Sequence, residues 1–335
     1  MGRRADAEVL AELHTILPHA SETGEFGPLE DLHRRVAGRD GIGLSTRLRI
    51  ECELEAQRSR TREVAASVRV WESLTHRAAA AGLPATDPTF MSIRSYRAQY
   101  IRRRGGPGDR ARGAALYEEE YRLRHAALGS DDPRTATAHA NLALALRDRG
   151  EPGDLALARS MLEKETLNRI RIHGANHPFS WIAQVIFAQT LVRMAEAEKD
   201  ESERRGLAQE AADVTHALLN SRRRRYGDSD GSTLRAHLVH AHALLVLGQE
   251  ESAVRELRAV QAAERRSAGD IDAGWTDLLL ARCLRGLDAR TAYVHARRAR
   301  ASQAALYTAQ SRQIEDTDRL IVELAAELGE AQGVS

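Results

Sequence analysis

One seven-residue pattern recurs along this chain and limits the folds that the chain can adopt. The segment GSDDPRT at 129–135 reappears as GANHPFS at 174–180 and, less faithfully, as GDSDGST at 227–233. In each copy an alanine follows the first glycine by 14 residues, and a leucine follows that alanine by three (Ala143 and Leu146 in the first copy). Self-similarity at a period of about 34 to 45 residues is typical of stacked helical hairpins. The pattern therefore predicts a helical solenoid.

The alanine of this pattern extends into a longer column. Its members are Ala98, Ala143, Ala188, Ala241 and Ala281, with spacings of 45, 45, 53 and 40 residues. A small residue lets two helices of a hairpin approach closely, and the leucine one turn later fills the space beside it. The longest spacing contains the charged stretch 196–205, which is interpreted as a lengthened turn between two helices.

Glycine and proline mark the expected helix boundaries. A glycine follows the predicted first helix of three units, at Gly105, Gly150 and Gly248, where helices commonly end. A proline stands in the first turn of the next helix, behind a capping Asp or His, at Pro88, Pro133 and Pro178. No segment of useful length alternates with a period of two, so no strand is expected. The predicted fold is all-α, an α-solenoid of stacked antiparallel hairpins.

The chain resembles tetratricopeptide repeat proteins, and within them the kinesin-light-chain-like subtype common in bacteria. The resemblance rests on the Gly-x-Asp-x-Pro-x-Thr segment, on NLALAL at 141–146 closed by Gly150, and on a period of roughly 42 residues, and it covers about 85–308. It implies a right-handed superhelix whose concave groove is lined by the first helix of each hairpin. Motifs of this kind specify a fold rather than a chemistry.

The expected organisation is one array between two caps. Residues 1–43 are predicted to form an N-terminal helical cap with helices near 5–19 and 28–37. Helices at 44–58 and 61–81 then begin a repeat array over 44–308, divided at about 44–86, 87–131, 132–176, 177–229, 230–271 and 272–308. A capping helix is expected at 309–329, because the last repeat has no neighbour to cover it, and a frayed tail at 330–335. Its predicted apolar stripe is Ile314, Thr317, Ile321, Leu324 and Leu328.

Composition restricts the partners and the compartment. The 335 residues carry a net charge of +1, so no general attraction to nucleic acid or membranes is implied. Two cysteines, Cys52 and Cys283, are too few for a disulfide framework. No apolar run approaches the length of a membrane span, and the N-terminus lacks a signal-peptide core. These features predict a cytoplasmic protein, and the 47 arginines against two lysines indicate a GC-rich bacterial genome.

The groove is predicted by counting along the first helices, with the column alanine at position 8. Position 9 includes two glutamines, positions 12 and 13 are mostly arginine, and position 6 holds one asparagine of the kind that peptide-binding relatives use. The predicted groove residues are Gln99, Arg102, Arg103, Asn141, Arg147, Asp148, Gln189, Arg193, Arg235, His242 and Arg282. Because the guanidinium group presents a planar donor fork, this groove favours an acidic protein or peptide.

Three other features receive structural interpretations. On a helix, His237 and His240 lie about 60° apart but His242 lies about 140° from His237, so the three do not form one metal site. The basic runs 102–104 and 222–225 are interpreted as solvated helix C-termini that meet the helix dipole. The three tryptophans are expected to pack between repeats.

Two functions remain open at this point. The preferred one is a non-enzymatic scaffold in bacterial regulation or complex assembly, with no catalytic residue, cofactor or metal. The alternative is a helical-repeat enzyme or biosynthetic accessory protein that uses the Arg/His groove on a small anionic substrate. A closed pocket around His139, His237 and His242, if the fold forms one, would favour the alternative. Aromatic residues make up only 4% of the chain, which disfavours nucleic acid as a partner, whereas self-association is left open.

Overall fold

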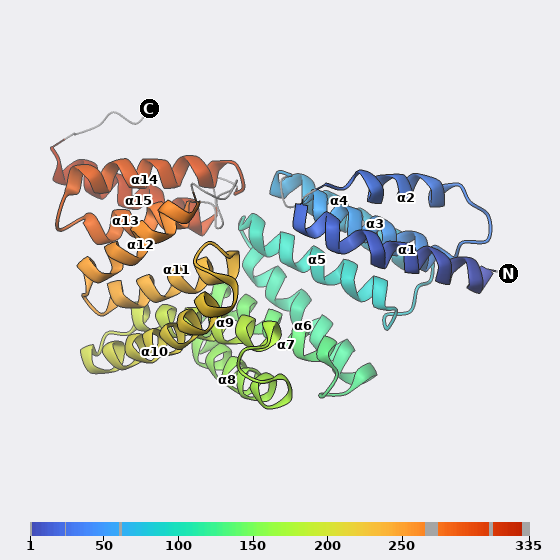
Figure 1. Ribbon diagram of the computed structural model, residues 1–335, viewed down its shortest axis with the longest axis horizontal. Coiled ribbons are helices and arrows are strands. Elements are labelled where there is room, and N and C mark those ends of the chain that lie inside the picture. The colour runs from blue at the N-terminus through green and yellow to red at the C-terminus, as the bar shows by residue number, and fades with distance from the viewer. Residues whose placement is uncertain (1, 24, 60–61, 265–273, 308–310, 330–335) are drawn as a thin grey trace. The chain divides into compact units, whose positions relative to one another are not determined.

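A computed structural model describes residues 2–23, 25–59, 62–264, 274–307 and 311–329. Within these ranges all fifteen regular elements are helices, which confirms the predicted α-solenoid class (Figure 1). None of the helices in the described part is long and apolar enough to cross a membrane. The tail predicted at 330–335 lies outside the described residues.

Two compact units make up the chain. Unit 1 comprises Met1–Ala138 with Leu306–Thr308, and unit 2 comprises His139–Ala305 with Ala309–Ser335. The boundary falls inside helix α7 (Pro133–Arg149).

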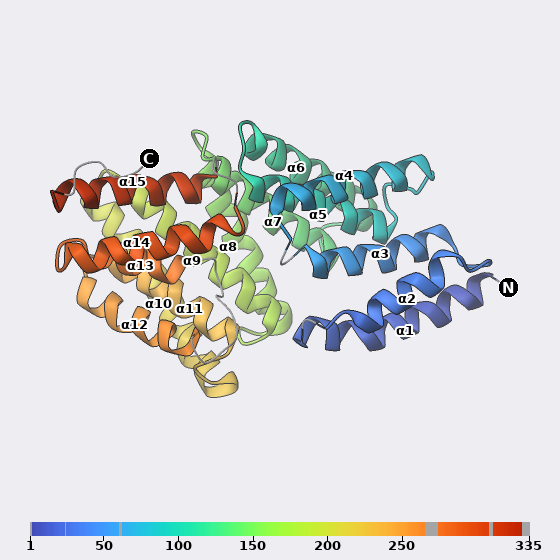
Figure 2. The same ribbon diagram turned by 90° about the horizontal axis from the view of Figure 1, so that it is seen from above.

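Unit 1 begins with α1 (Gly2–Thr23) and α2 (Gly27–Ala37), which contact each other and α3 (Leu44–Arg58) (Figure 2). It continues with α4 (Val64–Ala80), α5 (Pro88–Arg104) and α6 (Asp109–Leu128), where each helix packs on the next. The bounds of α3 agree with the predicted 44–58. In contrast, α1 is longer than the predicted 5–19, and α4 begins three residues after the predicted 61.

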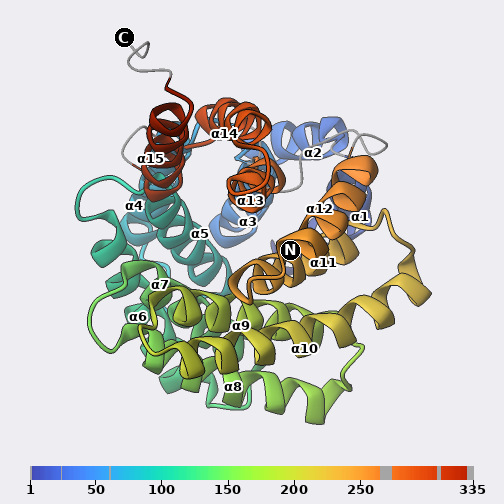
Figure 3. The same ribbon diagram turned by 90° about the vertical axis from the view of Figure 1, so that its left-hand side faces the viewer.

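In unit 2, as in unit 1, helices that follow one another along the chain pack together (Figure 3). It contains α8 (Asp154–His173), α9 (Pro178–Ala197), α10 (Glu201–Tyr226), α11 (Gly231–Val246), α12 (Glu250–Glu264), α13 (Trp275–Leu284), α14 (Ala289–Ala304) and α15 (Arg312–Glu327). From α8 to α15 each helix contacts the next, and the first helices α9, α11 and α13 also contact one another in order. The first helices therefore form a continuous surface in this unit.

The alanine column lies at the packed centre of the hairpins, as predicted. All five alanines are 0% exposed, so the helices have no room for a larger side chain at these positions. The predicted boundary residues are also confirmed. Gly105, Gly150 and Gly248 have φ of 68°, 69° and 73°, a left-handed conformation that glycine adopts without strain. The side chains of Asp87 and His177 accept backbone hydrogen bonds at the starts of α5 and α9.

The charged stretch 196–205 is not the lengthened turn that the sequence predicted. Helix α9 continues to Ala197 and α10 begins at Glu201, so only residues 198–200 separate them. The Asp200 side chain accepts a hydrogen bond from the Glu203 amide, and two acidic residues in the first turn favour this helix start. The extra residues of this unit therefore lengthen the two helices, and α10 reaches 26 residues.

The same turn joins the two helices of a hairpin in two successive repeats, and it corrects the interpretation of the run 102–104. The sequences RGGPGD at 104–109 and RGEPGD at 149–154 both place an arginine at a helix end and an aspartate at the start of the next helix. Arg104 pairs with Asp109 through two hydrogen bonds of 2.7 Å, and Arg149 pairs with Asp154 at 2.8 and 2.7 Å. Arg104 therefore closes a hairpin through a bidentate ion pair instead of projecting into solvent.

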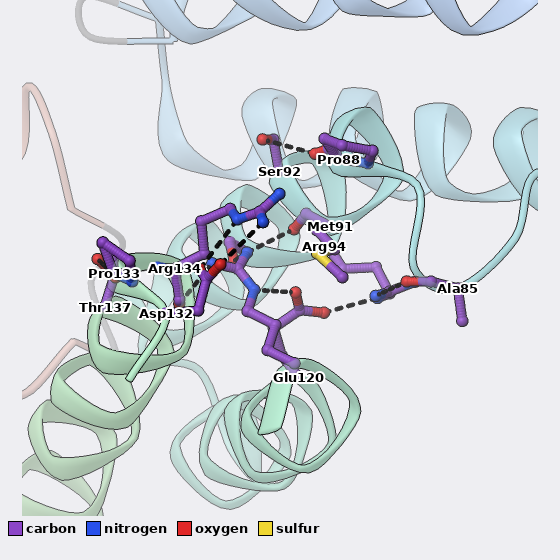
Figure 4. A network of polar contacts seen from close by, with 12 residues as sticks. Ala85, Pro88, Met91, Ser92, Arg94, Glu120, Asp132, Pro133, Arg134 and Thr137 are labelled. Atoms are coloured by element: carbon purple, nitrogen blue, oxygen red, sulfur yellow. Dashed lines mark hydrogen bonds and ion pairs between the residues drawn. The ribbon is translucent and has the colours of Figure 1, made fainter. Parts of the chain in front are cut away.

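Glu120 of α6 is the centre of a buried polar network in unit 1 (Figure 4). Its carboxylate is 1% exposed and accepts hydrogen bonds from Arg124 at 2.6 Å and from Arg94 at 2.7 Å. Arg124 also donates to the backbone carbonyl of Arg134, in the first turn of α7, at 3.0 Å. A buried charge is tolerated only where partners satisfy it. Because the Glu120 carboxylate requires both arginines, the network holds α5, α6 and the start of α7 together.

The same arrangement recurs 45 residues later and changes in the following unit. Glu165 pairs with Arg169, and Arg169 donates to the carbonyl of Phe179 at 3.2 Å. In the next copy Leu218 replaces the glutamate, and the Arg222 guanidinium lies 4.5 Å from the Trp181 ring centroid. Arg222 is only 5% exposed, so the interpretation of the run 222–225 as a solvated helix end is wrong at this residue. Trp181 packs in the interior, as predicted, with a cation–π partner.

The alanine column can be tested by overpacking. We expect Ala143→Leu to lower the free energy of unfolding by about 1–3 kcal/mol, because the added methylenes force neighbouring side chains from their rotamers. Urea unfolding followed by circular dichroism measures the change. The matched control is Ala156→Leu on the exposed side of α8, with an expected effect within about 0.5 kcal/mol. Equal effects of the two substitutions would contradict close packing at Ala143.

The Glu120 network predicts a larger loss. Glu120→Gln keeps the shape of the side chain but leaves two guanidinium groups without their carboxylate. Breaking a buried pair in this way costs about 3–5 kcal/mol, measured by urea unfolding. Glu118→Gln, an exposed residue on the same helix, is the control, with an expected effect within about 0.5 kcal/mol. A Glu120→Gln effect as small as that of the control would show that the network contributes little to stability.

Candidate functional site

The first helices of unit 2 bring several predicted groove residues together. Arg147 at the end of α7 donates to the side-chain oxygen of Gln189 on α9 at 3.3 Å, and its Nε lies 3.2 Å from a carboxylate oxygen of Asp148. The Arg147 side chain is 14% exposed. Its guanidinium is therefore held in place while part of it reaches the surface.

A second group joins three first helices at one carboxylate. Glu196 of α9 has one oxygen 2.9 Å from His242 Nε2 on α11 and 3.1 Å from Arg282 Nη1 on α13. Its other oxygen lies 3.4 Å from Arg193 Nη1, one turn earlier on α9. Three predicted groove residues thus converge on an acid that the sequence analysis did not select.

The protonation of Glu196 reflects this setting. Burial raises its pKa, but the hydrogen bond with His242 and the positive charges around it outweigh burial and lower the pKa from 4.5 to about 2. The Glu196 side chain is 26% exposed, and Glu196 lies one residue before the end of α9. Glu196 is consequently ionised at neutral pH and holds the neighbouring cationic groups in position.

Counting along the repeat did not reach Glu196. The predicted groove positions ended at position 13, where α5 and α7 approach their last residues. Helix α9 has 20 residues against 17 in each of α5 and α7, so its position 16 still belongs to the helix and lies beside α11 and α13. The longer spacing between Ala188 and Ala241 was the available signal, but it was interpreted as a loop.

The other predicted residues have separate surroundings. Gln99, Arg102 and Arg103 belong to α5 in unit 1, and Arg103 stacks over the Tyr100 ring at 5.3 Å. The Cβ of Arg102 faces Gly113 of α6, where an added Cβ would come within 3.1 Å of it. Arg102 therefore contributes to hairpin packing.

Asn141 and Arg235 lie in unit 2, on α7 and α11, and both are half-buried. Together with the groups around Gln189 and Glu196, they complete the predicted set in this unit. Four members of this set are arginines and one, Asp148, is an acid; Glu196, which was not predicted, adds a second acid. The first-helix surface of unit 2 therefore carries an excess of positive charge.

The histidines of α11 face different neighbours. His237 is 2% exposed and lies 2.8 Å from a carboxylate oxygen of Glu256 on α12, whereas His240 lies 3.0 Å from the Thr215 hydroxyl on α10. His242 instead joins Glu196 and packs edge-on against Trp275. His237 and His242 thus do not share their partners.

Glu196 predicts a pH-dependent contribution to stability. Because its folded pKa lies below the unfolded value, its stabilisation is complete well above pH 4.5 and decreases as the pH falls toward about 2. We expect Glu196→Gln to lower the free energy of unfolding by about 1–2 kcal/mol at pH 7, less than the full pKa shift implies because the side chain is partly exposed.

Urea unfolding of both proteins between pH 7 and pH 3 measures this contribution. The difference between wild type and Glu196→Gln should shrink as the pH falls below about 4.5. Glu163→Gln, an exposed residue on α8, is the control and should show a small effect throughout. A Glu196→Gln effect that is independent of pH would contradict an ion pair at this position.

Comparison with known proteins and solved structures gives a likeness at the level of the fold. No protein-family model matches the chain, and no curated protein matches its sequence. A variant of a putative kinesin light chain of Podosopora anserina with nearly identical TPR-like repeats superposes with a TM-score of 0.51 at 19% identity, over 68% of this chain and 99% of that one. A second structure of those repeats gives a TM-score of 0.49 at 19% identity, over 68% and 100%. The first likeness shows that the chain has a TPR-like helical repeat fold.

Proposed function

We propose that the chain is a non-enzymatic scaffold which binds an acidic protein or peptide on the first-helix surface of unit 2. The observation that carries this proposal is the set of arginines held at that surface by neighbouring polar side chains. Arg147 is oriented by Asp148 and Gln189, and Arg193 and Arg282 are oriented by Glu196. Side chains that are held before binding lose less conformational entropy when a ligand arrives.

The charges on this surface favour an acidic partner. Each guanidinium carries five donors in a planar fork, so the hydrogen bonds of Arg193 and Arg282 to Glu196 leave further donors of these two arginines that suit a carboxylate. TPR-like repeats supply such extended surfaces, and solenoids generally bind partners along them. The proposal includes a role in complex assembly or regulation within a bacterial cytoplasm, as the sequence composition indicates.

The test uses defined peptides. A fluorescein-labelled octaglutamate peptide is titrated with the protein, and binding is followed by fluorescence anisotropy against octaglutamine and octalysine. We expect the octaglutamate peptide to bind most tightly and to weaken between 50 and 300 mM salt, because screening shortens the reach of exposed charges. Arg147→Ala combined with Arg193→Ala should weaken binding at least about tenfold, since each lost charge-assisted hydrogen bond costs on the order of 1.5–3 kcal/mol.

The control is a pair of arginines on a different element. Arg204 and Arg205 lie in the first turns of α10 with exposed side chains, and their replacement by alanine removes the same charge. This control variant should bind the octaglutamate peptide with the wild-type affinity. Equal binding by the groove variant and wild type, or loss of binding only in the control, would place the acidic ligand on another face. Circular dichroism confirms that each variant is folded.

A further inference from the structure

A cavity of about 430 Å³ lies within unit 2 where α9 and the end of α13 face α15. Two of its lining residues, Arg193 and Arg282, also belong to the proposed groove. The residues that line it are Arg193, Glu196, Arg282, Arg285, Arg312, Asp316, Arg319, Leu320 and Glu323. Five arginines and three acids thus surround one cavity, which the sequence analysis did not identify.

Two clusters of the same composition face this cavity. In the first, Glu196 lies 3.1 Å from Arg282 and 3.4 Å from Arg193. In the second, Asp316 of α15 lies 3.5 Å from Arg312 and 4.0 Å from Arg319. Each cluster has one carboxylate between two guanidinium groups, and all four distances exceed the 2.7–2.9 Å of a strong charge-assisted hydrogen bond. Each cluster therefore retains one net positive charge and unused donor capacity.

The fifth arginine has a different role. Arg285 donates to Glu323 and to Glu327 of α15 at 2.6 Å in both cases. These short pairs satisfy its guanidinium and fasten the end of α13 to α15. Arg285 is thus part of the cavity wall, and the net positive charge comes from the two clusters.

The capping role of α15 does not explain these side chains. Arg312, Asp316, Arg319 and Glu323 recur every three or four residues and share one face of the helix. The opposite face carries the buried residues Ile314, Thr317, Ile321 and Leu324. The apolar face lies on the helix that packs against α14, and Glu323 helps to fasten α15 through Arg285. Neither contact involves Arg312, Asp316 or Arg319, so these three side chains are available for another role.

We propose that this cavity binds a phosphate monoester, carried on a side chain of the acidic peptide in the groove. A phosphate monoester has nearly two negative charges at neutral pH and three acceptor oxygens, which match two clusters of one positive charge each. A single carboxylate has half the charge and does not satisfy both clusters. The proposal rests on the proposed function, because Arg193 and Arg282 belong to the groove and the cavity alike.

The test compares three labelled octapeptides of seven glutamates and one variable residue, which is serine, glutamate or phosphoserine. We expect wild-type protein to bind the phosphoserine peptide about tenfold more tightly than the all-glutamate peptide, as measured by anisotropy. Arg312→Gln combined with Arg319→Gln should abolish this preference and leave the all-glutamate affinity nearly unchanged. Both side chains are well exposed, at 42% and 70%, so the variant should fold.

A second variant changes the preference in the opposite direction. Asp316→Asn removes the carboxylate that competes for Arg312 and Arg319, so it should raise the affinity for the phosphoserine peptide several-fold. Replacement of Arg204 and Arg205 by glutamine is the matched control and should preserve the preference. No phosphoserine preference in wild type, or a preference that survives in Arg312→Gln/Arg319→Gln, would overturn the proposal.

The outcomes separate this cavity from the groove. If the all-glutamate peptide binds but phosphoserine gives no advantage, the groove stands and the cavity proposal fails. If only the phosphoserine peptide binds, and Arg312→Gln/Arg319→Gln abolishes that binding, the cavity stands and the proposed groove fails. Free phosphoserine is titrated as a competitor. If free phosphoserine displaces the labelled phosphopeptide as effectively as the unlabelled phosphopeptide does, the cavity binds a small phosphorylated molecule. That result would overturn the proposal that the phosphate is carried by a peptide.

Discussion

The structure depends on the close approach of paired helices at a column of alanines. The five alanines at position 8 are fully buried, and those on α5, α9, α11 and α13 lie on helices that contact their neighbours. A repeat buries its apolar face only against adjacent repeats, so a single larger side chain at this position disturbs an entire hairpin interface. Within unit 2 the first helices α9, α11 and α13 contact one another in order, and the buried alanines on these helices keep that packing close.

Arginines on the second helices also stabilise the contacts between second and first helices. Arg124, Arg169 and Arg222 each stand 19 residues before a column alanine. The first two are oriented by a buried glutamate and donate to a carbonyl in the next first helix, whereas Arg222 stacks on Trp181. Burial lowers the pKa of Arg222, and the aromatic ring supplies part of the attraction that a carboxylate gives elsewhere. The same position of the repeat thus joins its helix to the next first helix in two units and to the preceding first helix in the third.

Local sequence signals were sufficient for the helices but not for their polar partners. The alanine spacing, the glycines at helix ends and the proline starts follow from backbone conformation and side-chain size, which act within a few residues. Glu196, in contrast, gains its role from residues 46 and 86 positions away, His242 and Arg282. The burial of Arg222 likewise depends on Trp181 of the preceding helix. Such pairings require knowledge of which helices become neighbours, and sequence counting alone does not supply it.

The last helix shows how a capping requirement leaves one helix face with side chains that do not take part in the cap. A solenoid end needs one apolar face to cover the final hairpin and one polar face toward solvent. In α15 the apolar requirement is met by Ile314, Leu320, Ile321 and Leu324, which are buried together with Thr317, and Arg285 fastens the helix through Glu323 and Glu327. The charges of Arg312, Asp316 and Arg319 add little to stability, since partly exposed ion pairs contribute at most about 1 kcal/mol each. They line the same cavity as Arg193 and Arg282, and the proposed phosphate site would give this arrangement a role that folding does not require.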